Sequence, residues 1–217
     1  TRELGVVFVV STGNLSPDSL PADPLASFPD YLLKDHARLV DPATALNAVT
    51  VGGLARHEAT RGQQQRPELI EDRPIARTGH PFPLTRSGPT VNGAIKPDFV
   101  EHAGNLAVVR LTGRTTYRGL GVVTTNGGFA GGHAFREEVG TSFAAPAVAH
   151  RAAKLLRRVP GASHNLLRAL LGAHAKWPDP SVSLLNPNDN AEGREKLTRL
   201  VGYGCINDDA LEQSLDN

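Results

Sequence analysis

Short apolar runs without polar alternation are the feature that most constrains how this chain can fold. Residues 5–10 (Gly-Val-Val-Phe-Val-Val) and 47–53 (Asn-Ala-Val-Thr-Val-Gly-Gly) are rich in β-branched side chains. A third strand candidate covers residues 95–100. Continuous apolar strands of this kind are typical of a parallel sheet that is covered on both faces. The runs therefore predict a buried sheet.

Two helices are predicted in the second half of the chain. Residues 147–159 place apolar side chains at helical i, i+3 and i+4 spacing, and Pro160-Gly161 ends the pattern. Residues 165–174 carry leucines on one side in the same way. Strands that are interleaved with helices favour the α/β class. Shorter elements are expected as a hairpin within 104–123, a strand at 202–206 and a closing helix at 208–215.

Polar and glycine-rich segments separate these elements. Residues 15–42 hold many Pro, Asp and Ser residues and predict a long loop with a helical turn around 31–39. Residues 56–86 are polar and predict an inserted surface segment. A glycine-dense loop at 124–133 precedes the segment that carries the chemistry.

Composition excludes several classes of protein. Lys and Arg number 23 against 22 Asp and Glu, so the net charge of +1 offers no basic excess for binding nucleic acid. No apolar run near the start is long enough to span a membrane. The single Cys205 excludes an internal disulfide framework, and it fits a reducing, cytoplasmic compartment without establishing one. We therefore expect neither nucleic acid nor a membrane as a partner.

Ser142 is the best candidate for a catalytic residue because of its position at the start of a predicted helix. It lies where a loop meets a predicted helix, and the first backbone N–H groups of a helix have no partners within the helix. Those groups stabilise developing negative charge. Pro146 fits the first helical turn, where a proline loses no hydrogen bond, and Gly140 suits a close backbone approach. Taken alone, such a serine would more often be an ordinary N-cap.

The string Gly140-Thr-Ser-Phe-Ala-Ala-Pro146 closely resembles the nucleophile motif of the subtilisin-like serine proteases, the subtilases, which usually reads Gly-Thr-Ser-Met-Ala-Ala-Pro. Upstream, Val9-Val-Ser-Thr-Gly-Asn14 is similar to the family strand that ends Ala-Ala-Gly-Asn. The resemblance implies that Ser142 is the nucleophile, and that Asn14 and the backbone N–H of Ser142 hold the oxyanion. It also implies that Ser11, Thr12 and Gly13 line the primary specificity pocket.

The similarity covers nearly the whole chain, from Val6 to about Leu211. It implies that residues 1–217 are the C-terminal portion of a catalytic domain with a three-layer α/β fold, whose mostly parallel sheet carries helices on both faces. One departure is Glu101-His-Ala-Gly104, where the family usually continues Ala-Pro-Gly. The resemblance therefore does not predict the conformation of the turn at this point. Inserts relative to the family are expected at about 15–42, 56–86 and 104–120.

The general base of a serine protease is not found in this sequence. A serine hydroxyl needs a His within about 3 Å, oriented by a carboxylate. The Asp and His motifs of the family precede its Asn strand, and none of the eight histidines here is followed by Gly-Thr. His133 and the pair Glu137-Glu138 lie near Ser142 in sequence, but they are interpreted as loop and turn residues. Because the chain also lacks Met, we interpret it as a segment of a longer protein that alone lacks efficient hydrolysis.

Three functions are compatible with these features to different degrees. The first is a serine endopeptidase, whose partners are a peptide or protein substrate and the missing N-terminal half of the same domain. The second is a non-catalytic subtilase-fold module that binds peptides or other partners. The third is an unrelated α/β hydrolase, but that class uses Gly-x-Ser-x-Gly, and Ser142 is followed by Phe-Ala.

Two further expectations concern assembly and metals. A sheet that lacks half of its strands exposes edges, so the segment is expected to form a homodimer or to swap strands. No cofactor is expected. Relatives often bind calcium, but the spacing of Asp18, Asp23 and Asp30 does not match a calcium-binding loop.

Overall fold

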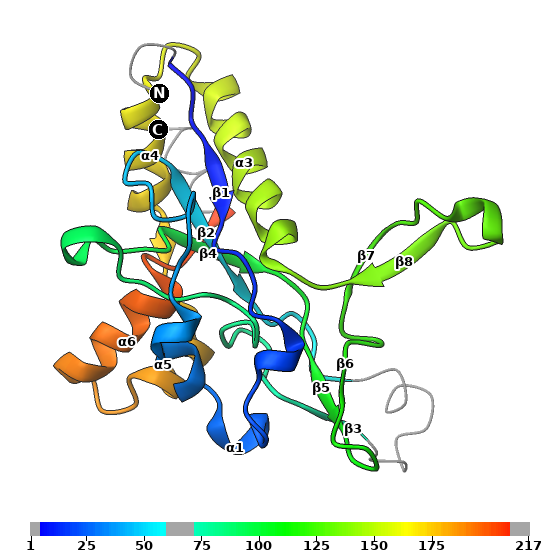
Figure 1. Ribbon diagram of the computed structural model, residues 1–217. Coiled ribbons are helices and arrows are strands. Elements are labelled where there is room, and N and C mark those ends of the chain that lie inside the picture. Colours follow the sequence, from blue (N-terminus) through cyan, green and yellow to red (C-terminus); the bar gives the residue numbers. More distant parts are fainter. Residues whose placement is uncertain (1–4, 60–71, 209–217) are drawn as a thin grey trace.

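The computed structural model describes residues 5–59 and 72–208. These residues form a mixed α/β structure with a parallel sheet at its centre and helices packed around it (Figure 1). The predicted α/β class is therefore confirmed. No helix in the two described ranges is both long and apolar enough to cross a lipid bilayer.

The central sheet has three parallel strands in the order β1–β2–β4. They are β1 (Val9–Ser11), β2 (Val49–Leu54) and β4 (Phe99–His102). The register places Val51 of β2 between Ser11 of β1 and Phe99 of β4. All of β2 is buried, as its apolar, glycine-ended sequence predicts for a central parallel strand.

Helix α3 (Thr141–Arg158) packs against all three strands of this sheet. Its buried residues Ala144, Val148, Ala152 and Leu155 recur at helical spacing and face the strands. The helix begins six residues before the predicted start at residue 147, because the nucleophile string itself is helical. Consequently the start of α3 lies beside the segment that follows β1.

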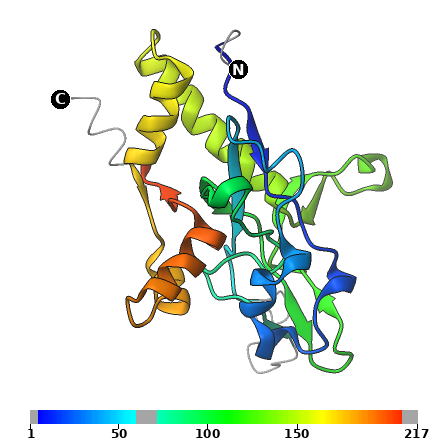
Figure 2. The same ribbon diagram turned by 60° about the vertical axis from the view of Figure 1, so that its left-hand side comes forward.

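Three more helices follow α3 in the chain. Helix α4 (His164–Ala173) confirms the prediction over 165–174, and the Ser163 hydroxyl caps it by accepting a hydrogen bond from Leu166 N–H at 3.2 Å. Helices α5 (Asp179–Leu185) and α6 (Ala191–Val201) were not predicted. Figure 2 shows α5 and α6 together, apart from the pair formed by α3 and α4.

Antiparallel strands build the rest of the structure. The expected hairpin within 104–123 is present as β5 and β6, and β3 extends it to three strands. Strands β7 and β8 form a second hairpin, whose far end is the glycine-dense loop. The short strand expected at 202–206 is β10, which pairs with β9. The bounds are β3 (Asp72–Pro74), β5 (Ala107–Val109), β6 (Thr115–Thr116), β7 (Val122–Thr125), β8 (Phe135–Glu138), β9 (Ala175–Lys176) and β10 (Cys205–Ile206).

Short helical turns occupy the long proline-rich loop. Helix α1 (Pro24–Ser27) begins where Asp23 Oδ1 accepts hydrogen bonds from the N–H groups of Leu25 and Ala26 at 3.1 and 3.0 Å. The turn expected around residues 31–39 is present as two 3₁₀ helices. The 3₁₀ helices of this loop are η1 (Pro17–Ser19), η2 (Asp30–Leu33) and η3 (Asp35–Ala37). Two others, η4 (Val91–Gly93) and η5 (Phe129–Gly131), lie further along the chain.

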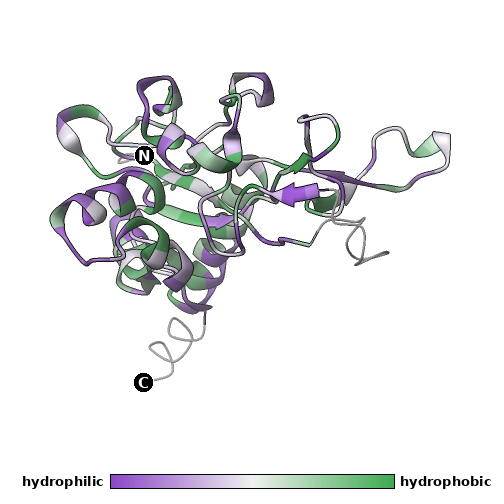
Figure 3. Cartoon of the chain, turned by 90° about the horizontal axis from the view of Figure 1, so that it is seen from below, coloured by the Kyte–Doolittle hydropathy of each residue, from purple (hydrophilic) through white to green (hydrophobic). Residues whose placement is uncertain are grey.

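The expectation that residues 56–86 form a surface segment is wrong for its second half. Ile75, Phe82 and Leu84 are buried and belong to the hydrophobic core. Their apolar side chains are spread among prolines and charged residues, so no periodic pattern marks them in the sequence. Figure 3 shows the hydrophobic colouring concentrated on the central strands, with hydrophilic residues around them. Residues 60–71 of this segment, and the expected closing helix from residue 209 onward, lie outside the described residues.

Candidate active site

Ser142 lies at the exposed start of α3, as its sequence context predicts. It is the second residue of the helix, and its side chain is exposed while the preceding Thr141 is completely buried. Gly140 caps the helix with φ 151° and ψ 153°, and its N–H donates to Ala103 O at 2.9 Å. This bond ties the loop before the helix to the end of β4. The hydroxyl of Ser142 therefore faces solvent from a firmly anchored turn.

Pro146 is not in the first turn of the helix, contrary to the expectation from sequence. It is the sixth residue of α3, because the helix begins at Thr141. A proline has no N–H, so the Ser142 carbonyl loses the partner that residue 146 would otherwise provide. The carbonyl of Ser142 thus has no partner at residue 146 within the helix.

Asn14 is brought to this turn from the other end of the chain. It lies three residues after the end of β1, and its Oδ1 accepts hydrogen bonds from Thr141 N–H at 3.0 Å and from Thr141 Oγ1 at 3.3 Å. Its Nδ2 lies 3.1 Å from the point that a Cβ on Gly140 would occupy. The carbonyl end of the carboxamide is therefore held by the nucleophile turn, and the N–H₂ end is left as a donor beside it.

The residues before Asn14 are positioned by the parallel sheet. Ser11 ends β1, and Thr12 N–H donates to Val51 O at 2.9 Å. Thr12 is completely buried, and its hydroxyl lies 3.3 Å from Thr85 Oγ1. The side chain of Thr12 is thus part of the interior, so only its backbone is available to a pocket beside Gly13. The role of Ser11, Thr12 and Gly13 in substrate binding stays a prediction.

A cavity of about 630 Å³ is lined in part by residues that follow Asn14 in the sequence. Its lining comes from the proline-rich loop after Asn14 and from the turn between β5 and β6. The lining residues are Pro17, Asp18, Leu20, Pro21, Ala22, Pro24, Gly113, Arg114 and Thr115. No local pattern in the sequence indicates that these two segments, separated by about a hundred residues, meet.

Neither His133 nor the two glutamates is positioned as a base for Ser142. In the described ranges no hydrogen bond reaches the Ser142 hydroxyl. His133 lies in the loop at the far end of the β7–β8 hairpin. Glu137 and Glu138 belong to strand β8 and not to a solvated turn, which corrects the interpretation from sequence. Glu137 Oε2 accepts from Gly119 N–H at 2.7 Å, and Glu138 pairs with Arg136 at 3.0 Å.

The departure from the family at Glu101 has a structural explanation. The buried Glu101 carboxylate contacts the guanidinium of Arg151 in α3, and Arg151 Nε donates to Asp208 Oδ1 at 2.8 Å. These ion pairs connect β4, α3 and the segment after β10. A long-range pair of this kind leaves no local signal in the sequence, so it was not predicted.

The side chains of His102, at the end of β4, and Cys205, in β10, have shifted pKa values. Burial lowers the pKa of His102, although the neighbouring Glu101 carboxylate acts in the opposite direction. The Nδ1 atom of His102 is buried and has no hydrogen-bond partner. Burial also raises the pKa of the Cys205 thiol to about 12, and Cys205 Sγ lies 3.2 Å from Val100 O. Both groups are therefore held in their neutral forms near pH 7.

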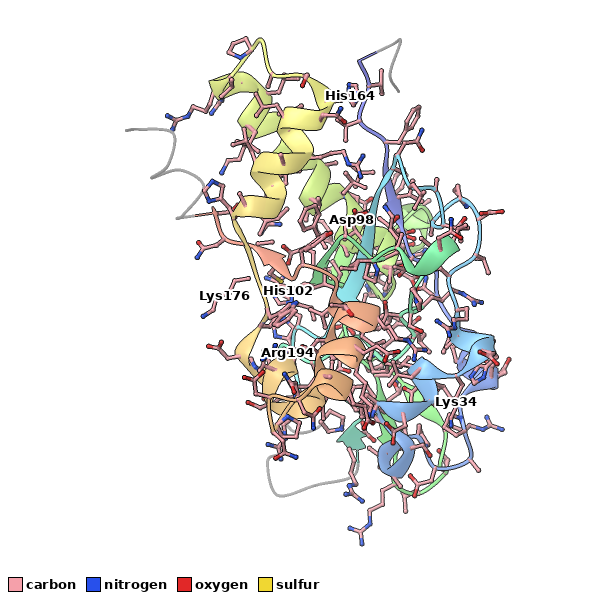
Figure 4. The ribbon with its side chains drawn as sticks, turned by 90° about the vertical axis from the view of Figure 1, so that its left-hand side faces the viewer. Lys34, Asp98, His102, His164, Lys176 and Arg194 are labelled. Carbon is pink, nitrogen blue, oxygen red and sulfur yellow. The ribbon has the colours of Figure 1, made fainter. Side chains whose placement is uncertain are left out.

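The described residues contain no group of three or more His, Cys, Asp or Glu side chains that could hold a metal ion. Asp23 is already engaged in capping α1, and Asp18 and Asp30 belong to η1 and η2. The absence of a calcium site at these three carboxylates stays a prediction. Figure 4 shows Lys34 and His164 far apart, in different parts of the fold.

The structure thus combines a parallel sheet, an exposed serine in the first turn of a helix, and an asparagine held against that turn. The sequence profile of the subtilase family matches residues 1–204 of the chain. The chain therefore belongs to the subtilase family, the serine proteases of the peptidase S8 class, which confirms the resemblance inferred from its motifs.

Two individual proteins are also similar to the chain. "Uncharacterized protein y4bN" of Sinorhizobium fredii (strain NBRC 101917 / NGR234) is 36% identical over 211 residues, which are 94% of this chain and 47% of that protein. The crystal structure of MycP1 with the N-terminal propeptide removed aligns with 97% of this chain and 51% of that chain, at 22% identity and a TM-score of 0.49. The chain thus spans about half the length of these two proteins.

Proposed function

We propose that this chain supplies the nucleophile and the oxyanion hole of a serine endopeptidase. Ser142 attacks the carbonyl carbon of a peptide bond, and the oxyanion that forms is held by Asn14 Nδ2 and the backbone N–H of Ser142. The observation that carries the proposal is the 3.0 Å hydrogen bond from Thr141 N–H to Asn14 Oδ1, which joins residues 127 positions apart. It orients the remaining amide donor toward the turn that carries the serine.

The reaction proceeds through an acyl-enzyme. The Ser142 oxygen forms a bond to the carbonyl carbon, and its proton passes to a histidine base. The amine leaves with a proton from that base, and water then releases the acid by the same route in reverse. The histidine and its carboxylate are assigned to the part of the domain that precedes this chain. A peptide or protein is the substrate, and no cofactor takes part.

A non-catalytic binding module is the second candidate. It is favoured by the absence, in the described part of the chain, of any hydrogen bond to the Ser142 hydroxyl. The buried anchoring of Thr141 and the placement of Asn14 favour catalysis, because a binding scaffold has no need for a free amide donor beside an exposed serine. The two functions differ in whether Ser142 can be acylated or phosphonylated.

Labelling with a fluorophosphonate tests the proposal. The intact protein is expected to be labelled at Ser142, and Ser142→Ala is expected to abolish the labelling. Asn14→Asp keeps an acceptor for Thr141 N–H and removes the amide donor, so the rate of labelling should fall by about 100- to 1000-fold while folding is retained. No labelling of the intact protein would leave the binding module as the function.

The same probe tests the assignment of the base. The isolated segment, residues 1–217, is expected to react only at a residual rate, because the oxyanion hole alone gives limited catalysis. Stoichiometric labelling of Ser142 in the segment would show that a general base lies within it and would contradict this assignment.

A further inference from the structure

The β7–β8 hairpin, residues 122–138, extends away from the body of the molecule in Figures 1 and 2, and is here called the arm. Only Val139 and Gly140 separate its second strand from α3. The arm therefore leads directly to the turn that carries Ser142.

The two faces of the arm differ in a way that is unusual for a free hairpin. The antiparallel register places Val123, Thr125, Phe135 and Glu137 on one face. Val123 and Phe135 are 68% and 66% exposed, whereas Val122 on the opposite face is half-buried. A sheet with one solvated face normally turns polar side chains to water. Exposed apolar side chains that cluster on one face mark a binding surface.

A cavity of about 400 Å³ lies between the arm and the residues that follow β6. It is lined by Tyr117, Arg118, Val123, Phe135, Arg136 and Glu137. Its volume is at the lower end of the range of about 300–1,000 Å³ for ligand pockets. A hollow of this size takes one or two side chains of an extended peptide.

The charges around the cavity indicate which peptide it fits. Glu137 is engaged by Gly119 N–H at 2.7 Å, and Arg136 pairs with Glu138 at 3.0 Å. Arg118 is exposed, and within residues 5–59 and 72–208 its guanidinium has no ion-pair partner. The Gly119 N–H is a neutral donor and does not offset the charge of Glu137, so the rim carries both signs. Arg118 is the lining cation without an ion-pair partner among these residues, and it can pair with a carboxylate of a bound peptide.

The strand edges supply the remaining element of recognition. In the described structure β7 and β8 pair only with each other, so the outer edge of each strand keeps unpaired N–H and C=O groups. An extended peptide can add to such an edge through main-chain hydrogen bonds, with alternate side chains entering a pocket.

We propose that the arm is an exosite for an extended segment of the polypeptide substrate. An aromatic or aliphatic side chain of this segment occupies the cavity beside Phe135, and an acidic side chain pairs with Arg118. The segment lies outside the scissile bond, and the arm directs the substrate toward Ser142. This inference rests on the proposed endopeptidase function.

Binding of a short fluorescent peptide to the intact Ser142→Ala protein provides the test. The peptide carries a central Phe and a neighbouring Asp, and its binding is followed by fluorescence anisotropy. Phe135→Ala is expected to weaken binding about tenfold, the usual effect of truncating an aromatic anchor. Phe129→Ala is the matched control, because Phe129 is 69% exposed on the same arm but does not line the cavity. Binding of the peptide to this variant should be unchanged.

The charge preference is tested in the same assay. Arg118→Glu should weaken binding of the Asp peptide and strengthen binding of the corresponding Lys peptide. Equal effects of Phe135→Ala and Phe129→Ala, or equal binding of both peptides to the parent protein, would overturn the proposal. A concentration-dependent dimer that Phe135→Ala abolishes would also overturn it, because a second copy would then cover this face.

The exosite and the catalytic proposal fail in distinguishable ways. Failure of Ser142 to react with the fluorophosphonate, with Phe135-dependent peptide binding intact, would overturn catalysis and leave the arm as a peptide-binding surface. Normal labelling with no Phe135-dependent binding would overturn the exosite alone. With both in place, Phe135→Ala should lower kcat/KM for a substrate that carries the Phe-Asp segment, and leave a substrate without that segment unaffected.

Discussion

A Cβ on Gly140 would lie 3.1 Å from Nδ2 of Asn14, which is closer than most real Cβ contacts. Gly140 also has a φ of 151°, which side chains rarely adopt. Gly140→Ala should therefore lower the free energy of unfolding by about 1–3 kcal/mol. It should also slow fluorophosphonate labelling of Ser142, since the proposed oxyanion donor, Asn14 Nδ2, is displaced. Gly127→Ala is the control, because a Cβ at Gly127 meets nothing within 4 Å. Equal melting curves for the two variants would contradict this expectation.

The ion pair between Glu101 and Arg151 should stabilise the packing of α3 on the sheet. Arg151→Met leaves the buried Glu101 carboxylate without its cation, and we expect a loss of about 3 kcal/mol in urea unfolding. Asp208→Asn removes only the more exposed partner, so it should cost less than about 1 kcal/mol. The double variant Glu101→Gln/Arg151→Met should recover much of the loss, and its failure to do so would argue against an uncompensated charge as the cause.

His102 should make the protein less stable in mild acid. Because burial lowers the pKa of His102 in the folded state, the unfolded chain binds the proton more readily. The resulting stability is complete above the unfolded pKa of about 6.5 and is lost as the pH falls toward the folded value. The urea midpoint should therefore decrease between pH 7 and pH 5, and it should decrease less in His102→Gln. Parallel curves for the two proteins would refute this assignment.

Cys205 should be nearly inert in the folded protein. Its pKa of about 12 leaves roughly a thousandfold less thiolate at pH 8 than an ordinary cysteine has. Modification by a disulfide reagent should be correspondingly slow in buffer and fast in denaturant. Because this is the only cysteine, the absorbance of the released thiol reports on one site. Rapid modification of the native protein would show that the segment around β10 opens readily.

The outer edge of β1 should promote self-association of the isolated segment. In the described sheet β1 has only β2 as a neighbour, and the adjoining Val6 and Phe8 are exposed. Open strand edges with apolar side chains pair with other chains. Size-exclusion chromatography with light scattering should detect a dimer, and Phe8→Lys should shift the population toward the monomer. A monomer at high concentration without this substitution would contradict the prediction.

The sequence predicted those parts of the structure that local patterns encode. Apolar runs located β2, helical spacing located α3 and α4, and the nucleophile string located the turn at Ser142. Helix α6 was missed although a signal was present. Asn190 caps it by accepting from Gly193 N–H at 2.8 Å, and Leu197, Leu200 and Val201 follow helical spacing. Charged residues between these positions obscured the pattern.

Contacts between distant segments could not be predicted in this way. The burial of Phe82 and the pairing of Glu101 with Arg151 depend on which segments meet in three dimensions. Asn14, which lies beside the turn that carries Ser142, could be singled out in the sequence only because its motif resembles that of a known family. Composition and periodicity alone would have described it as an ordinary turn.

The bond between Thr141 and Asn14 joins positions 127 residues apart, so it has a consequence for biosynthesis. At translation rates of about 5–20 residues per second, roughly 6–25 s separate the emergence of the two residues from the ribosome. During that interval neither the anchored carboxamide nor the helix turn exists as a unit. The proposed pairing of Ser142 with the Asn14 amide is therefore completed only when the synthesis of this chain is well advanced.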